Sequence, residues 1–531
     1  MERLAGRIIL VWGARRAALA VLAGAFGALA LPPVGFFAAL FVSFTILVWL
    51  LDGVSGNPDN SYSRGLRGAF LTGWLFGFGY FVAGLWWLGN ALLVEGDEFA
   101  WALPLAILGL PAVLAIFYGL AAMLAKFLWS DGAGRIAALS AAFGLVEWLR
   151  SVVATGFPWN AIGYGAMPMP LMMQSAHVIG LFGVTTLAVF VFASPALIGT
   201  RRGALPGLAV AALLFVAHIG YGAYVLLLPE TPQDNAKPVS VRLVQPVIDQ
   251  AAKLENSDRA AIFEKHLSLS ALPPRPDEKR PDVIVWPETS VPFILTENPD
   301  ALLRIADLLE EGQVLIAGAV RSEEQGAGAA PRFYNSVYVI DDKGQIIAAS
   351  DKVHLTPFGE YVPYEDVLRR FGVENLVNLP GGFSAAADRS LLPLPNGVKL
   401  YPLICYEIIF PDEMTPVLAQ AGAILNVTND AWFGYSPGPY QHLLQARVRA
   451  VENALPVIRN ANSGISAVID SKGRIISGLD FNVEGIVDST LTLEPVPKRH
   501  SYPLNLNFWL ILATVMGCAA ISRLGFIIAK N

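Results

Sequence analysis

Long apolar segments fill the first 228 residues of the chain, and one more lies near its end. Most of these segments approach or exceed the roughly 20 residues that a helix needs to cross a bilayer. The pattern therefore predicts a membrane α-helical bundle of about eight transmembrane helices. We place the spans at residues 14–31, 34–52, 67–89, 101–127, 134–150, 170–200, 204–228 and 505–527.

Two of these spans allow a second interpretation. The fifth is short and carries Glu147 and Arg150. These charges lie three positions apart, so they can pair with each other on a helix. The first span ends in an Ala-Leu-Ala sequence at residues 28–30, which resembles a signal-peptide cleavage site. However, Pro32 and Pro33 also suit a tight turn between two spans.

The lysines and arginines beside the spans predict how the chain crosses the membrane. If successive spans alternate in direction, these basic residues fall on one side, whereas the opposite loops are acidic or neutral. The residues concerned are Arg3, Arg7, Arg15, Arg16, Arg64, Arg67, Lys126, Arg135, Arg201, Arg202, Arg523 and Lys530. We therefore expect both ends of the chain in the cytoplasm. Residues 229–504 then lie on the far side, which in a bacterium is the periplasm.

Residues 229–504 follow a different pattern, in which short β-rich runs alternate with helical stretches. Strands are predicted at 239–244, 283–286, 314–319, 336–340, 346–349, 398–404, 423–427, 457–459 and 466–469. Helices are predicted at 257–271, 299–311, 412–421 and 438–453. This alternation is typical of an α/β domain with layered sheets and helices. The predicted domains are therefore 1–228, 229–504 and a last transmembrane helix at 505–531.

Composition agrees with a membrane location and excludes some functions. The chain is 54% hydrophobic and only 15% charged, whereas soluble globular chains are about 25% charged. A formal net charge of −6 and the lack of a basic cluster argue against nucleic acid binding. The six histidines are scattered without metal-ligand spacing. Because no nucleotide-binding glycine motif occurs either, we expect no metal and no cofactor.

Three predicted strands of the α/β domain end close to a reactive side chain. One run ends at Cys405, a second is stopped by Pro287 just before Glu288, and a third is followed by Lys352. Each residue alone fits a common alternative. Cys405 fits a buried, inert thiol, and Glu288 and Lys352 fit charges exposed to solvent.

Together, the three side chains suit attack on a carbonyl group. A thiol near its usual pKa is mostly protonated at neutral pH, so Cys405 needs a base, which Glu288 can supply. Attack on a carbonyl carbon creates an oxyanion. The Lys352 ammonium and the backbone N–H of Tyr406 can stabilise that oxyanion. Such a site requires no serine, histidine or metal.

The sequences around these residues resemble the three signature motifs of the carbon–nitrogen hydrolase (nitrilase) superfamily. The motifs are Trp-Pro-Glu at 286–288, Asp-Lys-Val-His-Leu-Thr-Pro-Phe-Gly-Glu-Tyr-Val-Pro at 351–363 and Ile-Cys-Tyr-Glu at 404–407. A further match is Asn-Val-Thr-Asn-Asp-Ala-Trp-Phe-Gly at 426–434, followed by Gln441 and His442. With membrane spans on both sides, the chain resembles the apolipoprotein N-acyltransferase family of this superfamily over nearly its whole length.

This resemblance implies a nitrilase-like α-β-β-α sandwich for the extramembrane domain. It carries the family's Glu–Lys–Cys triad over onto Glu288, Lys352 and Cys405. It places the accessory glutamate at Glu360, which would orient the Lys352 ammonium. Two further residues, Tyr406 and Glu407, follow the nucleophile as they do in the family. For Glu407, a paired structural carboxylate is an equally good interpretation.

The resemblance also implies a two-stage, ping-pong acyl transfer in the bacterial inner membrane. The thiolate would take an acyl chain from a phospholipid, typically phosphatidylethanolamine, and form a thioester. The α-amine of the diacylglyceryl-cysteine at an apolipoprotein N-terminus would then take the acyl chain, which completes lipoprotein maturation. The expected partners are thus the lipid donor, the diacylated apolipoprotein and membrane lipids, with the protein acting as a monomer.

Six further residues are candidates for substrate binding: four lie in aromatic loops at the outer membrane boundary or over the cleft, which suit acyl chains, and two belong to the matching motif at 426–442. They are Trp86, Trp159, Phe358, Asn429, Trp432 and His442. The alternatives are an ordinary interfacial aromatic belt and core packing. Leu254 stands where the superfamily often has a tryptophan, so the chain departs from the family pattern in that loop and lacks the aromatic side chain that could contact lipid there.

Two other functions fit parts of the sequence. A membrane-bound amidase of the same superfamily would transfer the acyl group to water instead of an amine. A transporter or channel with an outer binding domain belongs to a different class. Transporters usually show helix breaks at positions related by a repeat, and the sequence shows no internal repeat.

Overall fold

The computed structural model of the chain describes residues 1–55, 62–94, 99–200, 204–229, 235–250, 258–274, 279–326, 330–365, 382–495 and 504–530. Leu254, Arg201 and Arg202 lie outside the described residues. The chain divides into two compact units. The helical unit comprises Met1–Pro229, Tyr435–Leu444 and Tyr502–Asn531, and the α/β unit comprises Glu230–Gly434 and Gln445–Ser501.

Apolar helices make up most of the helical unit. They are α1 (Glu2–Ile9), α2 (Gly13–Gly27), α3 (Ala39–Asp52), α4 (Tyr62–Leu85), α6 (Leu110–Phe127), α7 (Ala133–Val152), α8 (Ile162–Gly165), α9 (Pro170–Met173), α10 (Ala176–Ala193), α11 (Ala204–Leu227) and α17 (Leu504–Lys530). A 3-10 helix, Trp86–Leu93, continues α4, and a π-helical turn, Leu105–Gly109, leads into α6.

Six helical segments among the described residues are long and apolar enough to cross a membrane. They are Gly13–Ala30, Gly65–Leu93, Ala100–Phe127, Ala176–Gly199, Ala204–Leu227 and Asn505–Ile528. All eight predicted segments contain helix, so the predicted helical bundle is confirmed, and the two predicted spans outside this group correspond to α3 and α7. The span predicted at 34–52 yields α3, a shorter apolar helix of 14 residues. The span predicted at 134–150 yields α7, which carries three charged residues.

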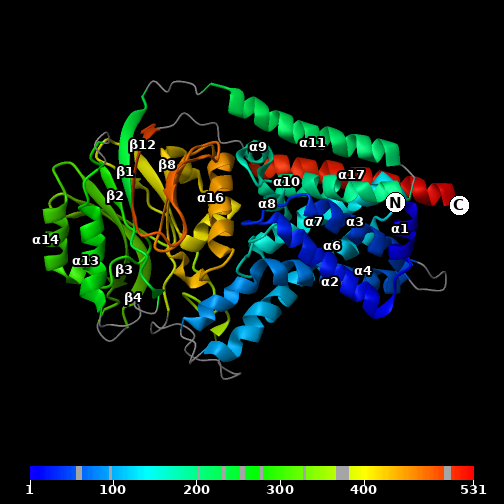
Figure 1. Ribbon diagram of the computed structural model, residues 1–531, viewed down its shortest axis with the longest axis horizontal. Helices are drawn as coiled ribbons and strands as arrows, with labels where there is room; N and C mark the ends of the chain where they lie inside the picture. Colours follow the sequence, from blue (N-terminus) through cyan, green and yellow to red (C-terminus); the bar gives the residue numbers. More distant parts are fainter. Residues whose placement is uncertain are drawn as a thin grey trace. The chain divides into compact units, whose positions relative to one another are not determined.

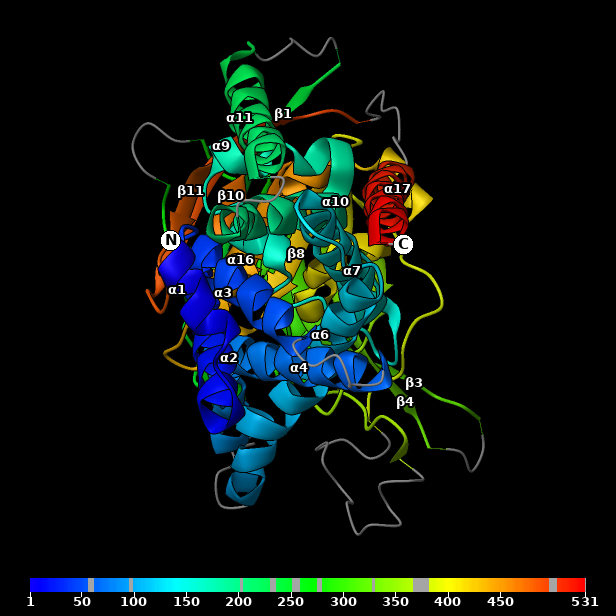
Figure 2. The same ribbon diagram turned by 90° about the vertical axis from the view of Figure 1, so that its right-hand side faces the viewer.

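The charges of α7 are satisfied inside the helical unit. Figure 2 shows α7 beside α6, α10 and α17, against which it packs. Glu147 and Arg150 form an ion pair in which both side chains are fully buried. The Tyr118 hydroxyl donates to Glu147 over 2.6 Å. The predicted pairing of these two charges is confirmed, and it removes the cost of an isolated charge among apolar helices.

Two six-stranded sheets form the centre of the α/β unit. Its strands are β1 (Lys237–Gln245), β2 (Val283–Val285), β3 (Val314–Glu323), β4 (Arg332–Asp341), β5 (Ile346–Asp351), β6 (Leu392–Pro393), β7 (Lys399–Ile404), β8 (Ala423–Thr428), β9 (Val457–Ala461), β10 (Ser466–Ile469), β11 (Ile475–Leu479) and β12 (Gly485–Leu493). The strand orders are β12-β1-β2-β3-β4-β5 and β11-β10-β9-β8-β7-β6. Strands β1, β2 and β3 run parallel, as do β7, β8 and β9.

Three helices complete the layers of this unit: α13 (Arg259–Ser270), α14 (Pro299–Leu308) and α16 (Gly438–Asn453). Figure 1 shows α13 and α14, then the two sheets, then α16. This is the predicted α-β-β-α sandwich, which is confirmed. The first part of α16, up to Leu444, belongs to the helical unit.

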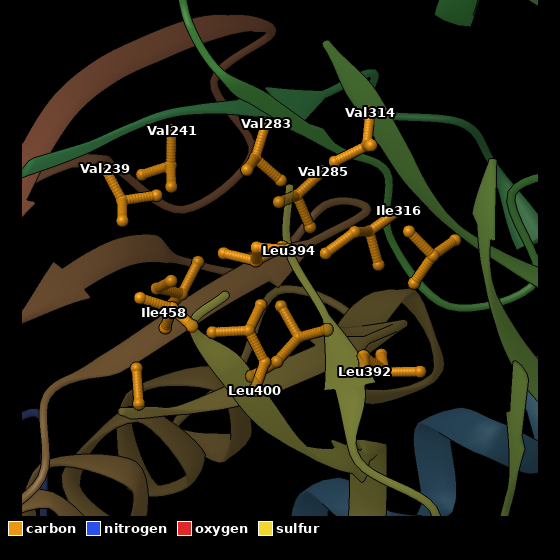
Figure 3. Close-up of a cluster of buried hydrophobic side chains, with 14 of the residues drawn as sticks. Val239, Val241, Val283, Val285, Val314, Ile316, Leu392, Leu394, Leu400 and Ile458 are labelled. Atoms are coloured by element: carbon orange, nitrogen blue, oxygen red, sulfur yellow. The ribbon is translucent and has the colours of Figure 1, made fainter. Parts of the chain in front are cut away.

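Alternating apolar residues build the core between the sheets. In β2, Val283 and Val285 point into a cluster that joins both sheets, whereas Ile284 points to a second cluster with α13 and α14. This alternation follows from the two-residue period of a strand. Figure 3 shows side chains of the first sheet, such as Ile316, facing Leu400 and other residues of the second sheet. The central strands are thus buried on both faces, as parallel strands usually are.

The predicted strands are all present, and one predicted helix is wrong. Residues 412–421 form two 3-10 turns, Pro411–Glu413 and Pro416–Gln420, instead of an α-helix. The cause is Pro416, because a proline disfavours helical backbone in the residue before it. Thr415 is accordingly extended, with φ −70° and ψ 163°. Strands β6, β11 and β12 were not predicted.

Candidate active site

The nucleophile candidate lies at a sharp turn after a buried strand. Strand β7 ends at Ile404, and a 3-10 helix, Cys405–Ile409, begins at the next residue. Cys405 has φ +51°, a left-handed conformation that costs energy for any residue other than glycine. Such strain persists only where the surrounding structure enforces it. The turn therefore places its backbone strain at Cys405, the residue that carries the sulfur.

Glu407 holds this turn against the segment that carries Lys352. Its Oε2 accepts the N–H of Ile404 over 2.7 Å. Its Oε1 accepts the N–H groups of Val353 and His354 over 2.8 and 3.0 Å. Arg389 donates to Oε2 over 2.7 Å, and both side chains are almost completely buried. One carboxylate thus fixes the residue before Cys405 and the two residues after Lys352.

A lysine between two carboxylates lies beside the thiol. The Lys352 Nζ is 2.8 Å from Glu360 Oε2 and 3.8 Å from Glu288 Oε1. Asn335 bridges the carboxylates, because its Nδ2 donates to Glu288 Oε1 over 2.8 Å and to Glu360 Oε1 over 2.7 Å. The Cys405 thiol is hydrogen-bonded to Glu288. The lysine therefore pairs mainly with Glu360, which leaves the Glu288 carboxylate available to the sulfur.

Burial and neighbouring charges set the protonation of these groups. Burial raises the pKa of Glu288, and Lys352 offsets this only in part. Burial alone would lower the pKa of Lys352, but Glu360 and Glu288 outweigh it and raise that pKa, so the lysine stays charged. Burial, and then the negative charge of Glu288, raise the pKa of the Cys405 thiol. The resting thiol is therefore protonated, and Glu288 is placed to take its proton.

Three of the predicted substrate-binding residues lie in the α/β unit. Phe358 is 56% exposed and has φ +63°, and Trp432 is half-buried. Asn429 is buried, and its side chain donates to Gln250 over 2.5 Å and accepts from Asn462 over 3.0 Å. Its backbone N–H donates to Glu288 Oε2 over 2.9 Å. Asn429 thus contacts the site through its backbone.

The other three lie in the helical unit. Trp86 is 43% exposed, whereas Trp159 and His442 are buried. The rings of Trp159 and His442 are 5.2 Å apart. The Trp159 indole donates to Gln441 over 2.9 Å, and the Trp87 indole donates to the same oxygen over 3.3 Å. Their contact with substrate stays a prediction.

Sequence reasoning missed three residues of the site. Asn335 bridges the two carboxylates, Arg389 pairs with Glu407, and the Thr428 hydroxyl oxygen lies 3.2 Å from the Cys405 sulfur. Polar residues inside the otherwise apolar strands β4 and β8 were the available signal for Asn335 and Thr428. No pattern marks Arg389, which lies outside the strands. Among the described residues, no cluster of three or more His, Cys, Asp or Glu residues fits a metal ion.

Known proteins match both the α/β part and the helical part of this chain. Residues 240–498 match the carbon-nitrogen hydrolase family, and residues 23–194 match the apolipoprotein N-acyltransferase N-terminal domain. The apolipoprotein N-acyltransferase of Allorhizobium ampelinum is 68% identical, and that of Rhizobium rhizogenes 67% identical, each over 100% of both chains. Among solved structures, Saccharomyces cerevisiae Nit3 of the nitrilase superfamily has a TM-score of 0.36 and 20% identity, over 50% of this chain and 93% of Nit3.

The family assignment rests on the full-length relatives, since the likeness to Nit3 is weak. The two family matches fall where the apolar spans and the strand-end motifs were predicted. They confirm the resemblance drawn from the three motifs. At 68% identity over its whole length, the chain belongs to the apolipoprotein N-acyltransferase family.

Proposed function

We propose that the protein transfers an acyl chain from a phospholipid, typically phosphatidylethanolamine, to the N-terminal α-amine of diacylglyceryl-cysteine in apolipoproteins. The carrier is a thioester on Cys405. The observation that carries this proposal is the hydrogen-bonded pair of Cys405 and Glu288 beside the Lys352 ammonium, in a chain that belongs to the apolipoprotein N-acyltransferase family. A covalent intermediate suits two bulky substrates that need not be bound together.

In the first stage, the Cys405 sulfur attacks the ester carbonyl carbon while its proton moves to Glu288. The negative charge of Glu288 helps to raise the pKa of the thiol, so protonation of Glu288 itself favours the thiolate. Lys352 and the N–H of Tyr406 stabilise the oxyanion. The tetrahedral intermediate collapses as the C–O bond breaks. Glu288 returns its proton to the departing lysophospholipid, which leaves the thioester.

In the second stage, the neutral α-amine of the lipoprotein attacks the thioester carbon. Glu288 takes a proton from the amine as the C–N bond forms, and the C–S bond then breaks. The thiolate regains its proton from Glu288, so the site returns to its starting state. The carboxylate thus acts first as base and then as acid in each stage, as microscopic reversibility requires.

The location of these steps follows from the charge pattern of the chain. We place the protein in the cytoplasmic membrane of a bacterium, with 229–504 as a periplasmic domain between the membrane regions 1–228 and 505–531. Basic residues beside the apolar segments support this orientation. Both substrates carry acyl chains in the outer leaflet, so a domain anchored there meets both of them.

A test is to mix the purified protein with phospholipid in the absence of lipoprotein and measure the intact mass. The wild-type chain should gain one acyl group, located at Cys405, and Cys405→Ser should gain none as a thioester. Addition of a diacylated lipopeptide should then discharge the adduct and yield N-acylated lipopeptide. Release of free fatty acid alone would favour the amidase, and turnover without an adduct would remove the covalent step.

A second prediction concerns Gly318 of β3, which leaves no room for a side chain behind Glu288. A Cβ there would lie 2.4 Å from the carbonyl oxygen of Pro287 and 2.7 Å from the Glu288 Cα. Because backbone must shift, we expect Gly318→Ala to move the base and slow acylation roughly 100-fold, as a misplacement of about 1 Å does. Initial rates of adduct formation measure this. Gly220→Ala, which meets nothing within 4 Å, is the control, and equal rates for both variants would contradict the prediction.

A further inference from the structure

The end of strand β8 contacts both the sulfur and the base. Thr428, its last residue, lies with its hydroxyl oxygen 3.2 Å from Cys405 Sγ and 2.9 Å from Asp430 Oδ1. The next residue, Asn429, donates its backbone N–H to Glu288 Oε2 over 2.9 Å. Thr428, Asn429 and Asp430 are all buried. Neither Thr428 nor Asp430 was among the predicted site residues.

The Thr428 hydroxyl has one hydrogen and two acceptors. It can donate to the Asp430 carboxylate or to the sulfur, but not fully to both. While the sulfur carries its proton, Asp430 is the charged acceptor and takes the hydrogen. When the sulfur becomes a thiolate, it is the charged acceptor on the other side. A hydrogen bond to a charged acceptor is roughly twice as strong as a neutral one.

Asp430 can release this hydrogen without becoming an unpaired buried charge. Its Oδ2 accepts from Arg459 Nη2 over 2.7 Å, and both side chains are completely buried. The carboxylate is also held in place from the other side. A Cβ on Gly464 would lie 2.2 Å from Asp430 Oδ2, so only glycine permits this approach. The ion pair thus keeps Asp430 fixed while the hydroxyl turns.

The thiolate needs such a donor, because the Lys352 ammonium that would stabilise it is shared with two carboxylates. Lys352 lies 2.8 Å from Glu360 and 3.8 Å from Glu288. Burial also raises the pKa of the Cys405 thiol. A second hydrogen-bond donor that is itself neutral therefore stabilises the thiolate relative to the thiol.

We propose that Thr428 is a switching hydrogen-bond donor that stabilises the Cys405 thiolate. Its hydroxyl donates to Asp430 in the resting site and turns to Sγ when Glu288 takes the thiol proton. The proton moves from sulfur to carboxylate, so the net charge of the site is unchanged, and the rotation moves no charge. The catalytic use of this switch rests on the proposed function, in which Cys405 is the nucleophile.

The experiment measures how fast iodoacetamide alkylates Cys405 between pH 6 and pH 11 in the full-length protein. Cys518→Ala is the background, because it leaves Cys405 as the only cysteine of the chain. The variants are Thr428→Val, which keeps the shape and loses the hydroxyl, and Thr428→Ser, which keeps the hydroxyl. We expect the rising limb of the rate profile for Thr428→Val to shift to higher pH by about one unit or more. This shift corresponds to a roughly tenfold slower alkylation at a given pH. Thr428→Ser should stay within about twofold of the parent.

The two variants separate thiolate stabilisation from packing. A change in access to the sulfur would scale the rate equally at every pH, whereas a lost hydrogen bond moves the limb along the pH axis. An unmoved limb in Thr428→Val overturns the proposal, and so does a limb that moves equally in Thr428→Ser. If Thr428→Val unfolds at a lower temperature than the parent, Thr428→Ala replaces it under the same expectation.

Failure of this inference can be told from failure of the proposed function. The acyl adduct is measured on the protein with Thr428 intact. If that protein forms the adduct and the Thr428→Val limb does not move, only the switch is wrong. If that protein forms no adduct during turnover, the covalent function is wrong, whatever the alkylation profiles show.

Discussion

Glu288→Gln should stop acylation of Cys405 and leave the fold intact. The amide has nearly the shape of the carboxylate but cannot take the thiol proton. Loss of a general base typically lowers a rate by a factor of about 10² to 10⁴. Glu288→Gln also removes the acid that protonates the leaving alkoxide. We therefore expect the rate of acylation to fall by a factor near the upper end of that range. The intact-mass assay with phospholipid measures the rate of adduct formation directly.

The control for this variant is an exposed glutamate of the same unit. Glu311 is exposed and lies in a turn after α14, so Glu311→Gln should acylate at the parent rate. The thermal unfolding midpoints of the two variants should agree within a few degrees. An unchanged acylation rate in Glu288→Gln would exclude Glu288 as the base. A large fall in its midpoint would assign it a structural role instead.

The same variant gives a test by pH. The base must be ionised, and burial raises the pKa of Glu288 above its usual range. The wild-type rate should therefore fall on acidification at a pH above about 4.3, the value of an unperturbed glutamate. The residual rate of Glu288→Gln should lack this fall. A wild-type rate that stays constant down to pH 4.3 would contradict a raised pKa in the working site.

Local pattern was enough to find the central strands but not the edges of the sheets. The predicted strands bury both faces, so they appear in the sequence as short apolar runs. Strand β11 lies at the edge of its sheet and is largely exposed, and β6 has only two residues. Strand β12, at the edge of the other sheet, is mostly half-buried. The apolar residues of β11 and β12 do not form an unbroken buried run, and the pairing of these strands is set by their neighbours.

The residues of the site also fall into two groups, those that the sequence could predict and those that it could not. Glu288, Lys352 and Cys405 follow strands, so their proximity could be expected from the layering of an α/β domain. Their partners could not, because pairing across sequence depends on the finished fold. Asn335 meets Glu288 from 47 residues away, and Thr428 meets Cys405 from 23. A buried arginine such as Arg389 gives no local signal, because only its distant partner makes its burial tolerable.

Arg389→Met should strongly destabilise the α/β unit while it spares the reacting residues. It leaves Glu407, which is completely buried, without its cation. Removal of one partner from a buried ion pair costs about 3–5 kcal/mol. In a unit of this size, that corresponds to a fall of roughly 10 °C in the unfolding midpoint. Differential scanning of the full-length protein in detergent measures it.

The destabilisation caused by Arg389→Met should become smaller as the pH falls. Burial would raise the pKa of Glu407, but Arg389 outweighs it and holds that pKa below its usual value. A lowered folded pKa gives stability that is complete above the unfolded pKa of about 4.3 and is lost as the pH falls through the folded value. In Arg389→Met, burial dominates and the carboxyl binds a proton more readily. Acidification from pH 7 towards pH 5 should therefore neutralise Glu407 in Arg389→Met before it does so in the wild type. The difference between the unfolding midpoints of the two proteins should then become smaller.

A double variant shows whether the cost comes from the unpaired charge. Arg389→Met with Glu407→Gln replaces the ion pair by neutral groups, and the amide can still accept the N–H of Ile404 or those of Val353 and His354. We expect the double variant to unfold several degrees above Arg389→Met and to lose the pH dependence, since the pair rather than the arginine's packing carries the effect. If the double variant unfolds at the same temperature as the single, lost packing around Arg389 is the cause. If the difference in unfolding midpoint between Arg389→Met and the wild type stays constant between pH 7 and pH 5, the unpaired charge of Glu407 is not the cause of the destabilisation.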